Sequence, residues 1–261
     1  MDSPIRLIST DFDGTLHADF EEPPVAAVAE QVIGELQSKG VKWVINTGRE
    51  LPSLLEGLHQ ARLSIWPDYV VTVEREIHAR RNSKYVGWED WNSRCGLDHM
   101  RIFECIQSDI PKLADWINSR FKANVYADAY SPLCLIAEST RDAGLIHDYL
   151  NDYCRGVPNL TVVRNHIYAR LSHAEYNKGT ALAEIGRRLG IKSAQTVAIG
   201  DHLNDMPMLS THFARWLVAP SNAVEEVKDL VRRQKGYVSD EPHGYGVARG
   251  LRFILASFGG D

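Results

Sequence analysis

The sequence predicts an α/β fold in which a doubly wound parallel sheet is interrupted by an inserted α+β domain. Short apolar runs alternate with helical patterns up to residue 78 and again from residue 178, which is typical of parallel strands covered by helices on both faces. Between these stretches the pattern favours paired strands and longer helices. We therefore expect a core formed by residues 1–78 and 176–261, with an inserted cap domain formed by residues 79–175.

The first part of the core is expected to contain three strands and two helices. Val25, Val28, Val32 and Leu36 recur at the spacing of one helical face, and Gly40 follows them as a helix stop. The apolar runs around this helix have the length of strands. The expected elements are a strand over residues 5–9, a helix over 25–36, a strand over 41–45, a helix over 51–63 and a strand over 69–73.

The second part of the core resumes the same alternation. Ala181, Leu182, Ile185 and Leu189 mark the apolar face of a helix that Gly190 ends. Further apolar runs and helical patterns follow to the end of the chain. The expected elements are a helix over residues 178–189, a strand over 196–199, a helix over 206–209, a strand over 216–218, and helices over 224–231 and 247–256.

The inserted domain has a different pattern, which favours an antiparallel sheet. Its longest helical stretch runs over residues 97–122 and is interrupted near Asp109-Ile110-Pro111. Asn165-His166 lies between two short apolar runs and favours a hairpin turn. The other expected elements are strands over residues 84–86, 124–127, 133–137, 160–163 and 167–171, and a helix over residues 143–154.

Composition and charge exclude several classes of partner. The chain is 44% hydrophobic and 24% charged, with a net charge of −5, so there is no electrostatic reason to expect nucleic acid or an anionic membrane. It contains no run of 18 apolar residues and no apolar signal sequence after Met1. The four cysteines form no CxxC pair, which favours reduced thiols over a zinc site. We expect a cytoplasmic protein, monomeric or a small homo-oligomer, acting on a small molecule.

Two carboxylates follow the first predicted strand. Asp11 and Asp13 are two residues apart in a segment that continues with Gly14, which permits a tight turn, and Thr15, which offers a hydroxyl. Such an arrangement can hold a divalent cation, attack a phosphorus atom and transfer a proton. The alternative is a turn in which the Asp side chains only cap the end of the strand.

Three further segments follow in a characteristic order. Thr47, Gly48 and Arg49 come after the second strand, Lys178 opens a helix, and the segment from Asp201 follows the strand over residues 196–199. Together the four segments resemble the signature motifs of the haloacid dehalogenase (HAD) superfamily of phosphotransferases. The resemblance implies a HAD-type, Rossmann-like core in which the first strand lies between the second and the fourth.

The spacing of the motifs resembles one subclass of this superfamily. Only 31 residues lie between Thr15 and Thr47, whereas Lys178 comes 131 positions after Thr47. A large domain can be inserted only at the second point. This layout resembles the subclass with a late α/β cap, which includes Cof-like sugar phosphatases, sucrose-phosphate phosphatase and phosphomannomutase. The junctions are short, as expected of a hinged lid.

The resemblance also implies a role for each acidic residue. Asp11 is expected to be the nucleophile and Asp13 the general acid and base. Mg²⁺ is the expected cofactor, because this hard cation prefers oxygen ligands. Asp11, the backbone carbonyl of Asp13 and Asp201 are the expected ligands, and Asp205 is expected to orient them. The alternative for Asp201 and Asp205 is the N-terminus of a helix with an acidic first turn.

Substrate-binding residues are expected around the phosphate. Thr47 would donate a hydrogen bond from its hydroxyl to the phosphate, and Gly48 would let the backbone come close to it. Lys178 would contribute a compact positive charge. Arg49 and Asn204 are further candidates for contacts with substrate or phosphate. The alternative for Arg49 is a surface ion pair. The alternative for Asn204 is a place beside the metal site, where it would orient the metal ligands. Asn46 is a weaker candidate, since a turn explains it equally well.

One position departs from the pattern of the superfamily. Relatives with a late cap commonly carry Asn-Gly after the third strand, and this chain has Glu74-Arg75. We expect this exchange to leave the chemistry untouched but to weigh against assigning a relative's substrate to this chain. Aromatic and basic residues of the expected cap offer either sugar and phosphate contacts or ordinary packing and solvation. They are Trp88, Trp91, Arg80, Arg81 and Lys84.

The sequence therefore predicts a Mg²⁺-dependent phosphatase for a small phosphomonoester, with a sugar phosphate as the leading substrate class. The first alternative is a phosphohexomutase of the phosphomannomutase type, because it shares the order of the motifs and the position of the cap. A more remote alternative is a non-catalytic protein that binds sugar phosphates. Loss of Asp11 or Asp13 would mark such a protein, and both are present.

Overall fold

The computed structural model describes residues 4–258 and divides the chain into two compact units. The first unit runs up to Glu89 and resumes at Asn177, and the second unit is Asp90–Tyr176. The expected boundary near residue 78 therefore lies too early, because residues 79–89 belong to the first unit. The expected second boundary, after residue 175, lies within one residue of the division in the structure.

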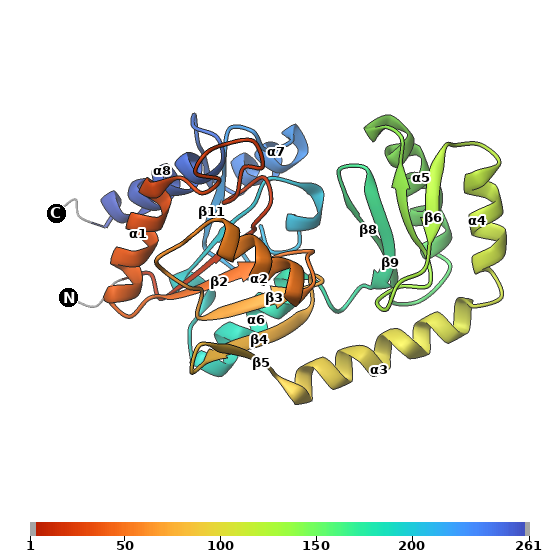
Figure 1. The fold of residues 1–261 in the computed structure, drawn as a ribbon, viewed down its shortest axis with the longest axis horizontal. Helices are drawn as coiled ribbons and strands as arrows, with labels where there is room; N and C mark the ends of the chain where they lie inside the picture. Colours follow the sequence, from red (N-terminus) through yellow and green to blue (C-terminus); the bar gives the residue numbers. More distant parts are fainter. Residues whose placement is uncertain (1–3, 259–261) are drawn as a thin grey trace. The chain divides into compact units, whose positions relative to one another are not determined.

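The first unit is built on an eight-stranded sheet in the order β12-β11-β10-β1-β2-β3-β4-β5 (Figure 1). β1 lies between β2 and β10, as the resemblance implied, and these three strands are parallel. The strands are β1 (Leu7–Thr10), β2 (Lys42–Asn46), β3 (Tyr69–Thr72), β4 (Glu76–Arg81), β5 (Lys84–Gly87), β10 (Thr196–Ile199), β11 (Trp216–Ala219) and β12 (Tyr237–Val238).

The register of the three central strands brings their carboxyl ends to one edge of the sheet. Thr10, the last residue of β1, pairs with Ile45 of β2 and with Ile199 of β10. All residues of β1 and β10 are buried, and apolar residues therefore predominate in them, with Ser9, Thr10 and Thr196 as the polar members. The residues that follow these strands therefore emerge side by side, although they are far apart in the sequence.

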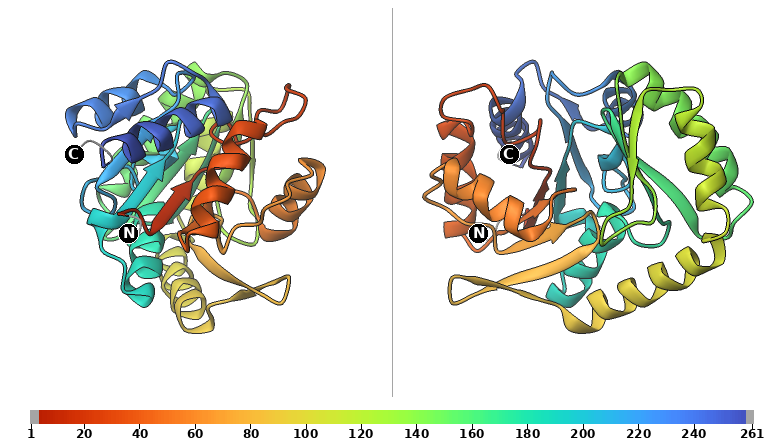
Figure 2. Two further views of the ribbon diagram at one scale, coloured as in Figure 1. Left: turned by 90° about the vertical axis from the view of Figure 1, so that its left-hand side faces the viewer. Right: turned by 45° about the vertical axis from the view of Figure 1, so that its right-hand side comes forward.

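Helices cover both faces of this sheet. One apolar core contains side chains of α1 (Ala27–Ser38), α2 (Leu51–Gln60) and α8 (His243–Ala256). Helices α1 and α8 lie side by side in both views (Figures 1 and 2). α6 (Lys178–Leu189) and α7 (Glu225–Arg233) complete the unit. Successive residues of a strand point to opposite faces: Ile8 belongs to the core with α1, whereas Leu7 contacts Gly186 of α6.

The helix expected over residues 206–209 is absent from the structure. The segment contains a single 3₁₀ turn at Leu203–Asp205, followed by turns. The carboxylate of Asp205 accepts hydrogen bonds from the backbone N–H groups of Asp201 and His202. These bonds close a local turn, and Pro207 lacks the N–H that a helix would need. The segment is thus a loop at the end of β10.

The first unit is extended by an antiparallel hairpin, of which the sequence pattern predicted only the second strand and assigned it to the inserted domain. β4 pairs with β3 and β5 pairs with β4. Arg80, Arg81, Lys84 and Trp88 therefore lie in the first unit and not in the inserted domain. Two of these residues make packing contacts. The guanidinium of Arg188 lies 4.2 Å from the ring centre of Trp88, and the guanidinium of Arg80 lies 5.5 Å from the ring centre of Trp66.

The second unit is an antiparallel sheet with three helices, as expected for the inserted domain. Its strand order is β6-β7-β9-β8, and Figure 1 shows α4 and α5 on one side of this sheet. Trp91 packs here against Tyr176, with ring centres 5.4 Å apart. The elements are α3 (Glu89–Ile106), α4 (Ile110–Asn118), β6 (Ala123–Tyr126), β7 (Cys134–Ala137), α5 (Thr140–Cys154), β8 (Leu160–Asn165) and β9 (Tyr168–His173).

The described residues bear on two predictions made from composition, which concern membrane-spanning segments and the state of the cysteines. Among residues 4–258, no helix combines the length and the hydrophobicity needed to cross a bilayer. All four cysteines are free: Cys95, Cys134 and Cys154 are buried, and Cys105 is exposed. The expectation of reduced thiols is therefore consistent with their placement, and three of them contribute to packing.

Candidate active site

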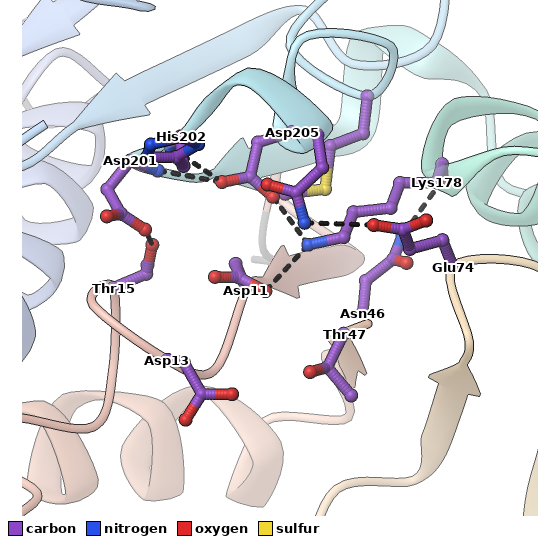
Figure 3. A network of polar contacts seen from close by, with 12 residues as sticks. Asp11, Asp13, Thr15, Asn46, Thr47, Glu74, Lys178, Asp201, His202 and Asp205 are labelled. Atoms are coloured by element: carbon purple, nitrogen blue, oxygen red, sulfur yellow. Dashed lines mark hydrogen bonds and ion pairs between the residues drawn. The ribbon is translucent and has the colours of Figure 1, made fainter. Parts of the chain in front are cut away.

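The four motifs meet at the carboxyl edge of the central strands (Figure 3). Asp11 follows β1 directly, Thr47 follows β2, and Asp201 comes two residues after the end of β10. Lys178 is the first residue of α6. The parallel register described above brings these positions together across up to 190 positions of sequence. The convergence expected from the sequence is therefore present.

Lys178 is the centre of the polar network. Its side chain is fully buried, and its Nζ lies 2.7 Å from Asp11 Oδ1 and 2.6 Å from Asp205 Oδ1. Two asparagine side chains hold Lys178 in place, one from the residue before it and one from the end of β2. Asn177 caps α6 by accepting hydrogen bonds from the next N–H groups of the helix, and Asn46 Nδ2 donates to the carbonyl of Lys178 across 2.9 Å. The ammonium thus points at the carboxylates (Figure 3).

The electrostatic balance of this network favours an additional cation. Burial, followed by the charge of Asp205, raises the pKa of Asp11 well above its usual value, although Lys178 acts in the opposite direction. Burial lowers the pKa of Lys178, but the charges of Asp11 and Asp205 outweigh burial and leave it raised. The neighbouring carboxylates thus add to the effect of burial on Asp11 and overcome the effect of burial on Lys178.

Asp201 lies on the other side of Asp11 from Lys178. Its Oδ1 accepts a hydrogen bond of 2.6 Å from the hydroxyl of Thr15. Burial and the charge of Asp205 raise its pKa to about 7, and the Thr15 hydrogen bond opposes this shift. A Cβ atom on Gly14 would lie 2.5 Å from Asp201 Oδ2, and Gly14 has a φ of +77°. Only glycine allows Asp201 to approach the loop so closely.

The carboxylates of Asp11, Asp201 and Asp205 have the chemistry of a divalent-cation site. One oxygen of each lies within 4.8 Å of the others, and all three residues are buried. Hard oxygen donors with excess negative charge suit Mg²⁺. Asp205 also accepts hydrogen bonds from Asp201 N and His202 N, at 2.9 and 3.0 Å. Asp205 therefore closes the turn that follows β10 and also lies in the acidic cluster.

The side chain of Asp13 lies apart from this cluster. It forms a bidentate ion pair with Arg49, whose Nε and Nη2 lie 2.7 and 2.5 Å from its two oxygens. Figure 3 shows its carboxylate pointing away from Asp11 and Lys178. The ion pair considered as an alternative for Arg49 is present, and its partner is Asp13. The side chain of Asp13 is thus not a member of the carboxylate cluster.

The segment after β2 forms a second wall of the site. Thr47 is buried, and its Oγ1 accepts a hydrogen bond of 3.2 Å from the backbone N–H of Arg49. Glu74 packs against this segment, because its Oε1 lies 3.5 Å from the position of a Cβ on Gly48. Asn204 Nδ2 donates to the same carboxylate oxygen across 3.0 Å. Asn204 therefore contacts Glu74 in the structure.

Several residues of the site were not foreseen. The carboxylate of Glu74 was not among the expected site residues, yet it accepts a hydrogen bond from Asn204, lies beside Gly48 and contributes to the raised pKa of Lys178. Two groups from the end of the chain hold the loop of Gly14, whose carbonyl accepts from Asn222 Nδ2 and contacts His243 Nδ1, each at 2.8 Å. Nothing in the local sequence around either residue signals this contact.

The chain belongs to the haloacid dehalogenase-like hydrolase family, whose sequence profile matches residues 8–74 and 117–251. This match contains all four motifs and confirms the family that the sequence resembled. It also covers most of the inserted domain. The family accounts for the order of the central strands and for the convergence of the motif residues at one edge of the sheet.

Three known proteins illustrate the relationship. The chain is 24% identical to the 5-amino-6-(5-phospho-D-ribitylamino)uracil phosphatase YcsE of Bacillus subtilis over 96% of this chain and 96% of that protein. It is 26% identical to a phosphoglycolate phosphatase of Staphylothermus marinus over 96% and 98%. The structure of the sucrose-phosphatase from Synechocystis sp. PCC6803, in complex with sucrose and phosphate, is similar in fold, with a TM-score of 0.68, 20% identity and 97% coverage of both chains.

These relationships identify the class of enzyme. A hydrolase family profile and full-length similarity to named phosphatases make this protein a phosphatase. The predictions of an α/β fold with an inserted domain and of a phosphoric monoester hydrolase are thereby confirmed. A phosphatase acts on a phosphorylated substrate, and the two sequence relatives act on chemically different ones.

Proposed function

We propose that this phosphatase hydrolyses a small polyhydroxylated phosphomonoester, such as a sugar phosphate, through an aspartyl-phosphate at Asp11 and with Mg²⁺ as cofactor. The observation that carries the proposal is the buried ion pair between Lys178 and Asp11, with its distance of 2.7 Å. An ammonium held at this distance fixes one oxygen of the carboxylate. The other oxygen remains available for attack on phosphorus.

The first chemical step would be attack by Asp11 on the phosphorus atom, in line with the leaving oxygen. The bond to the leaving oxygen breaks as the bond to Asp11 forms. Asp13 would give a proton to the leaving oxygen, because an alkoxide is a poor leaving group near neutral pH. It would then take a proton from the water that hydrolyses the acyl-phosphate. Rotation of Asp13 away from Arg49 is part of this proposal.

The phosphate group would be held by residues on the opposite side from Asp201. Thr47 can donate from its hydroxyl, the backbone at Gly48 permits close approach, and Lys178 provides positive charge. Arg49 can donate a hydrogen bond to the phosphate once Asp13 moves away from it. Asn204 would lie beside these residues and contact the substrate or phosphate. These roles are inferred from the contacts of each residue, together with the resemblance of the motifs.

Mg²⁺ would be held by Asp11 and Asp201, with the backbone carbonyl of Asp13 as a third ligand and Asp205 orienting them. When bound, the cation supplies positive charge against the repulsion between a carboxylate and a phosphate, which is ~4 kcal/mol for two unit charges about 4 Å apart at an effective dielectric near 20. The clustering of the three buried carboxylates supports this assignment. Burial and, after it, the charge of Asp205 raise the pKa of Asp201 to about 7, and a cation would favour its ionised form.

The proposed substrate class is supported by two of the known proteins. The name of the Bacillus subtilis relative describes a phosphate on a ribityl chain, and the structural neighbour is a sucrose-phosphatase. Both names describe leaving groups rich in hydroxyls. Closure of the inserted domain over the site as a lid stays a prediction from the sequence.

A panel of phosphorylated metabolites tests the proposal. The purified protein should release inorganic phosphate from at least one sugar or polyol phosphate in the presence of Mg²⁺, and EDTA should abolish the release. Hexose 1-phosphates, with and without a catalytic amount of hexose 1,6-bisphosphate, address the mutase alternative. Formation of the 6-phosphate faster than phosphate release, and only with the bisphosphate, would support a mutase and contradict the proposal.

A further inference from the structure

Two loops at the carboxyl edge of the sheet carry none of the four motifs. β11 runs parallel to β10, and β12 runs parallel to β11. The carboxyl ends of parallel strands meet at one edge, so the segments after β11 and β12 emerge at the same edge as Asp11 and Asp201. The first of these segments contains Asn222, and the second contains His243.

Asn222 and His243 converge on one backbone carbonyl of the first motif. Asn222 Nδ2 and His243 Nδ1 each lie 2.8 Å from the oxygen of Gly14. A carbonyl oxygen only accepts hydrogen bonds, so Nδ1 of His243 carries the proton. Asn222 Oδ1 in turn accepts from the backbone N–H of His243 across 2.8 Å. The three residues thus form a closed ring of hydrogen bonds in which the two donors hold each other.

The backbone around His243 supports this contact. His243 has a φ of +46°, a conformation that few residues other than glycine adopt and that persists where the surroundings enforce it. The next residue, Gly244, lies against the motif loop, because a Cβ atom there would lie 3.3 Å from the carbonyl oxygen of Leu16. The start of α8 therefore packs on the residue that follows Thr15.

The hydrogen bonds hold both peptide groups that flank Gly14. The peptide before Gly14 contains the carbonyl of Asp13, the proposed third ligand of the cation, and its N–H donates to the carbonyl of His17 across 2.9 Å. The N–H and C=O of a trans peptide point in opposite directions, so this bond directs the Asp13 carbonyl away from His17. Asn222 and His243 hold the peptide after Gly14. A glycine would otherwise let either peptide rotate.

The segment of Asn222 also contacts the loop of a second proposed ligand. The backbone N–H of Val224 donates to the backbone carbonyl of Asp201 across 2.9 Å. The loop after β11 is thus bonded to Gly14 through a side chain and to Asp201 through its backbone. This connection is separate from the hydrogen bond between the Thr15 hydroxyl and the carboxylate of Asp201.

From these contacts we propose that Asn222 and His243 are positioning residues of the cation site. They act through the backbone of Gly14: by holding its carbonyl, they keep the carbonyl of Asp13 in a fixed place relative to Asp201. A cation with strict demands on ligand geometry, such as Mg²⁺, binds more tightly when its ligands are already in place. The inference rests on the proposed Mg²⁺-dependent function and assigns part of its metal affinity to two loops outside the motifs.

The test measures Mg²⁺ binding by the full-length protein without substrate. Tm is recorded over a range of MgCl₂ concentrations for the wild type, Asn222→Ala, His243→Leu and the double variant. The Mg²⁺ concentration needed for a given rise in Tm scales with the dissociation constant. We expect the double variant to need at least about tenfold more Mg²⁺, the lower end of the effect of losing groups that orient metal ligands. Each single variant should need an intermediate concentration, because one donor remains.

Two further variants separate positioning from a purely structural role. His243→Asn restores a donor, because Asn Nδ2 and His Nδ1 are both attached to Cγ and asparagine tolerates a positive φ. This variant should respond to Mg²⁺ as the wild type does. Gln31→Ala is the control, because Gln31 is an exposed amide on α1 that donates only a local hydrogen bond, to Glu35, in the described structure. Its response to Mg²⁺ should be unchanged.

The outcomes distinguish the inference from the proposed function. A double variant with a lower Tm but the wild-type response to Mg²⁺ would overturn the inference and leave the phosphatase function standing. A His243→Asn variant no better than His243→Leu, or a Gln31→Ala variant altered as much as the double variant, would do the same. The single variants are judged in this way if the double variant does not fold. A wild-type Tm that Mg²⁺ does not change would contradict the proposed cofactor, and the inference with it.

Discussion

Lys178 donates a hydrogen bond of 2.7 Å to the carboxylate of Asp11, although 167 positions of sequence separate them. Both side chains are buried, and the same ammonium reaches Asp205 at 2.6 Å. The bond exists because α6 begins beside the carboxyl end of β1. Asp201 is held by the hydroxyl of Thr15 at 2.6 Å, and the charge of Lys178 lowers its pKa less than burial and the charge of Asp205 raise it.

Removal of the Lys178 charge should destabilise the protein and increase its response to Mg²⁺. In Lys178→Met, two buried carboxylates lose their ammonium, which costs about 3–5 kcal/mol of unfolding free energy. A bound cation would offset part of that loss, so Mg²⁺ should raise the Tm of the variant more than that of the wild type. Thermal unfolding with and without Mg²⁺ measures both effects. Lys39→Met, at an exposed position after α1, is the control.

A Tm for Lys178→Met within the range of the Lys39→Met control would contradict the importance of the buried ion pair. A wild-type Tm that rises with Mg²⁺ as much as that of the variant would contradict the electrostatic explanation. Both results come from measurements of thermal unfolding, so they do not depend on the identity of the substrate.

Gly14→Ala should impair the site beyond the strain of its backbone. Gly14 and Gly190 share a positive φ, of +77° and +64°, but only at Gly14 would a Cβ meet another atom, Asp201 Oδ2 at 2.5 Å. Both substitutions should cost about 1 kcal/mol through strain, and Gly14→Ala should also displace Asp201. We expect a clear loss of kcat for Gly14→Ala and none for Gly190→Ala. Equal activities would show that Asp201 tolerates displacement.

Thr15→Val should weaken Mg²⁺ binding. The Thr15 hydroxyl holds Asp201 at 2.6 Å, and loss of a group that orients a metal ligand typically lowers metal affinity about 10–100-fold. The Mg²⁺ concentration for half-maximal activity gives the change. Thr196→Val is the control, because the Thr196 hydroxyl donates to the carbonyl of Lys192, away from the carboxylates. If the Mg²⁺ concentration for half-maximal activity is the same in the wild type and in both variants, the assignment of Asp201 to the metal site is contradicted.

Asp13→Asn should affect poor leaving groups more than good ones. A general acid contributes about 10²–10⁴-fold when the leaving oxygen needs a proton. An aryl phosphate needs this help less than a sugar phosphate, so kcat should fall further for the sugar ester. The control is Asp19→Asn, an exposed aspartate in the same loop. Equal losses with both esters would assign Asp13 a role other than proton transfer.

The sequence predicted the parts of the site that depend on strand order. Asp11, Thr47 and Asp201 each follow a buried strand, and the carboxyl ends of parallel strands meet at one edge of the sheet. Lys178 was predictable because Asn177 gives a clear start to α6. These positions depend on backbone register, which the hydrophobic pattern determines. The hydrophobic pattern therefore predicted where the residues nearest to the strand ends lie, and the roles of these residues stay predictions.

The sequence did not predict features that depend on side-chain direction or on half-buried strands. β4 alternates between half-buried and buried residues and ends in the exposed Arg80 and Arg81, so its pattern does not resemble that of the fully buried strands β1 and β10. The direction of Glu74 follows from two positive φ values that no local pattern predicts. The Asp13–Arg49 pair could be foreseen only as one alternative among others.

The central claim is that Asp11 is the nucleophile, and Asp11→Asn tests it most directly. An amide of the same shape cannot form the acyl-phosphate, so turnover of any substrate that the wild type hydrolyses with Mg²⁺ should be lost almost completely. The measurement is kcat for the variant and the wild type, with folding checked by circular dichroism. Retention of more than about a tenth of wild-type kcat, a barrier change below ~1.4 kcal/mol, would contradict the assignment of Asp11.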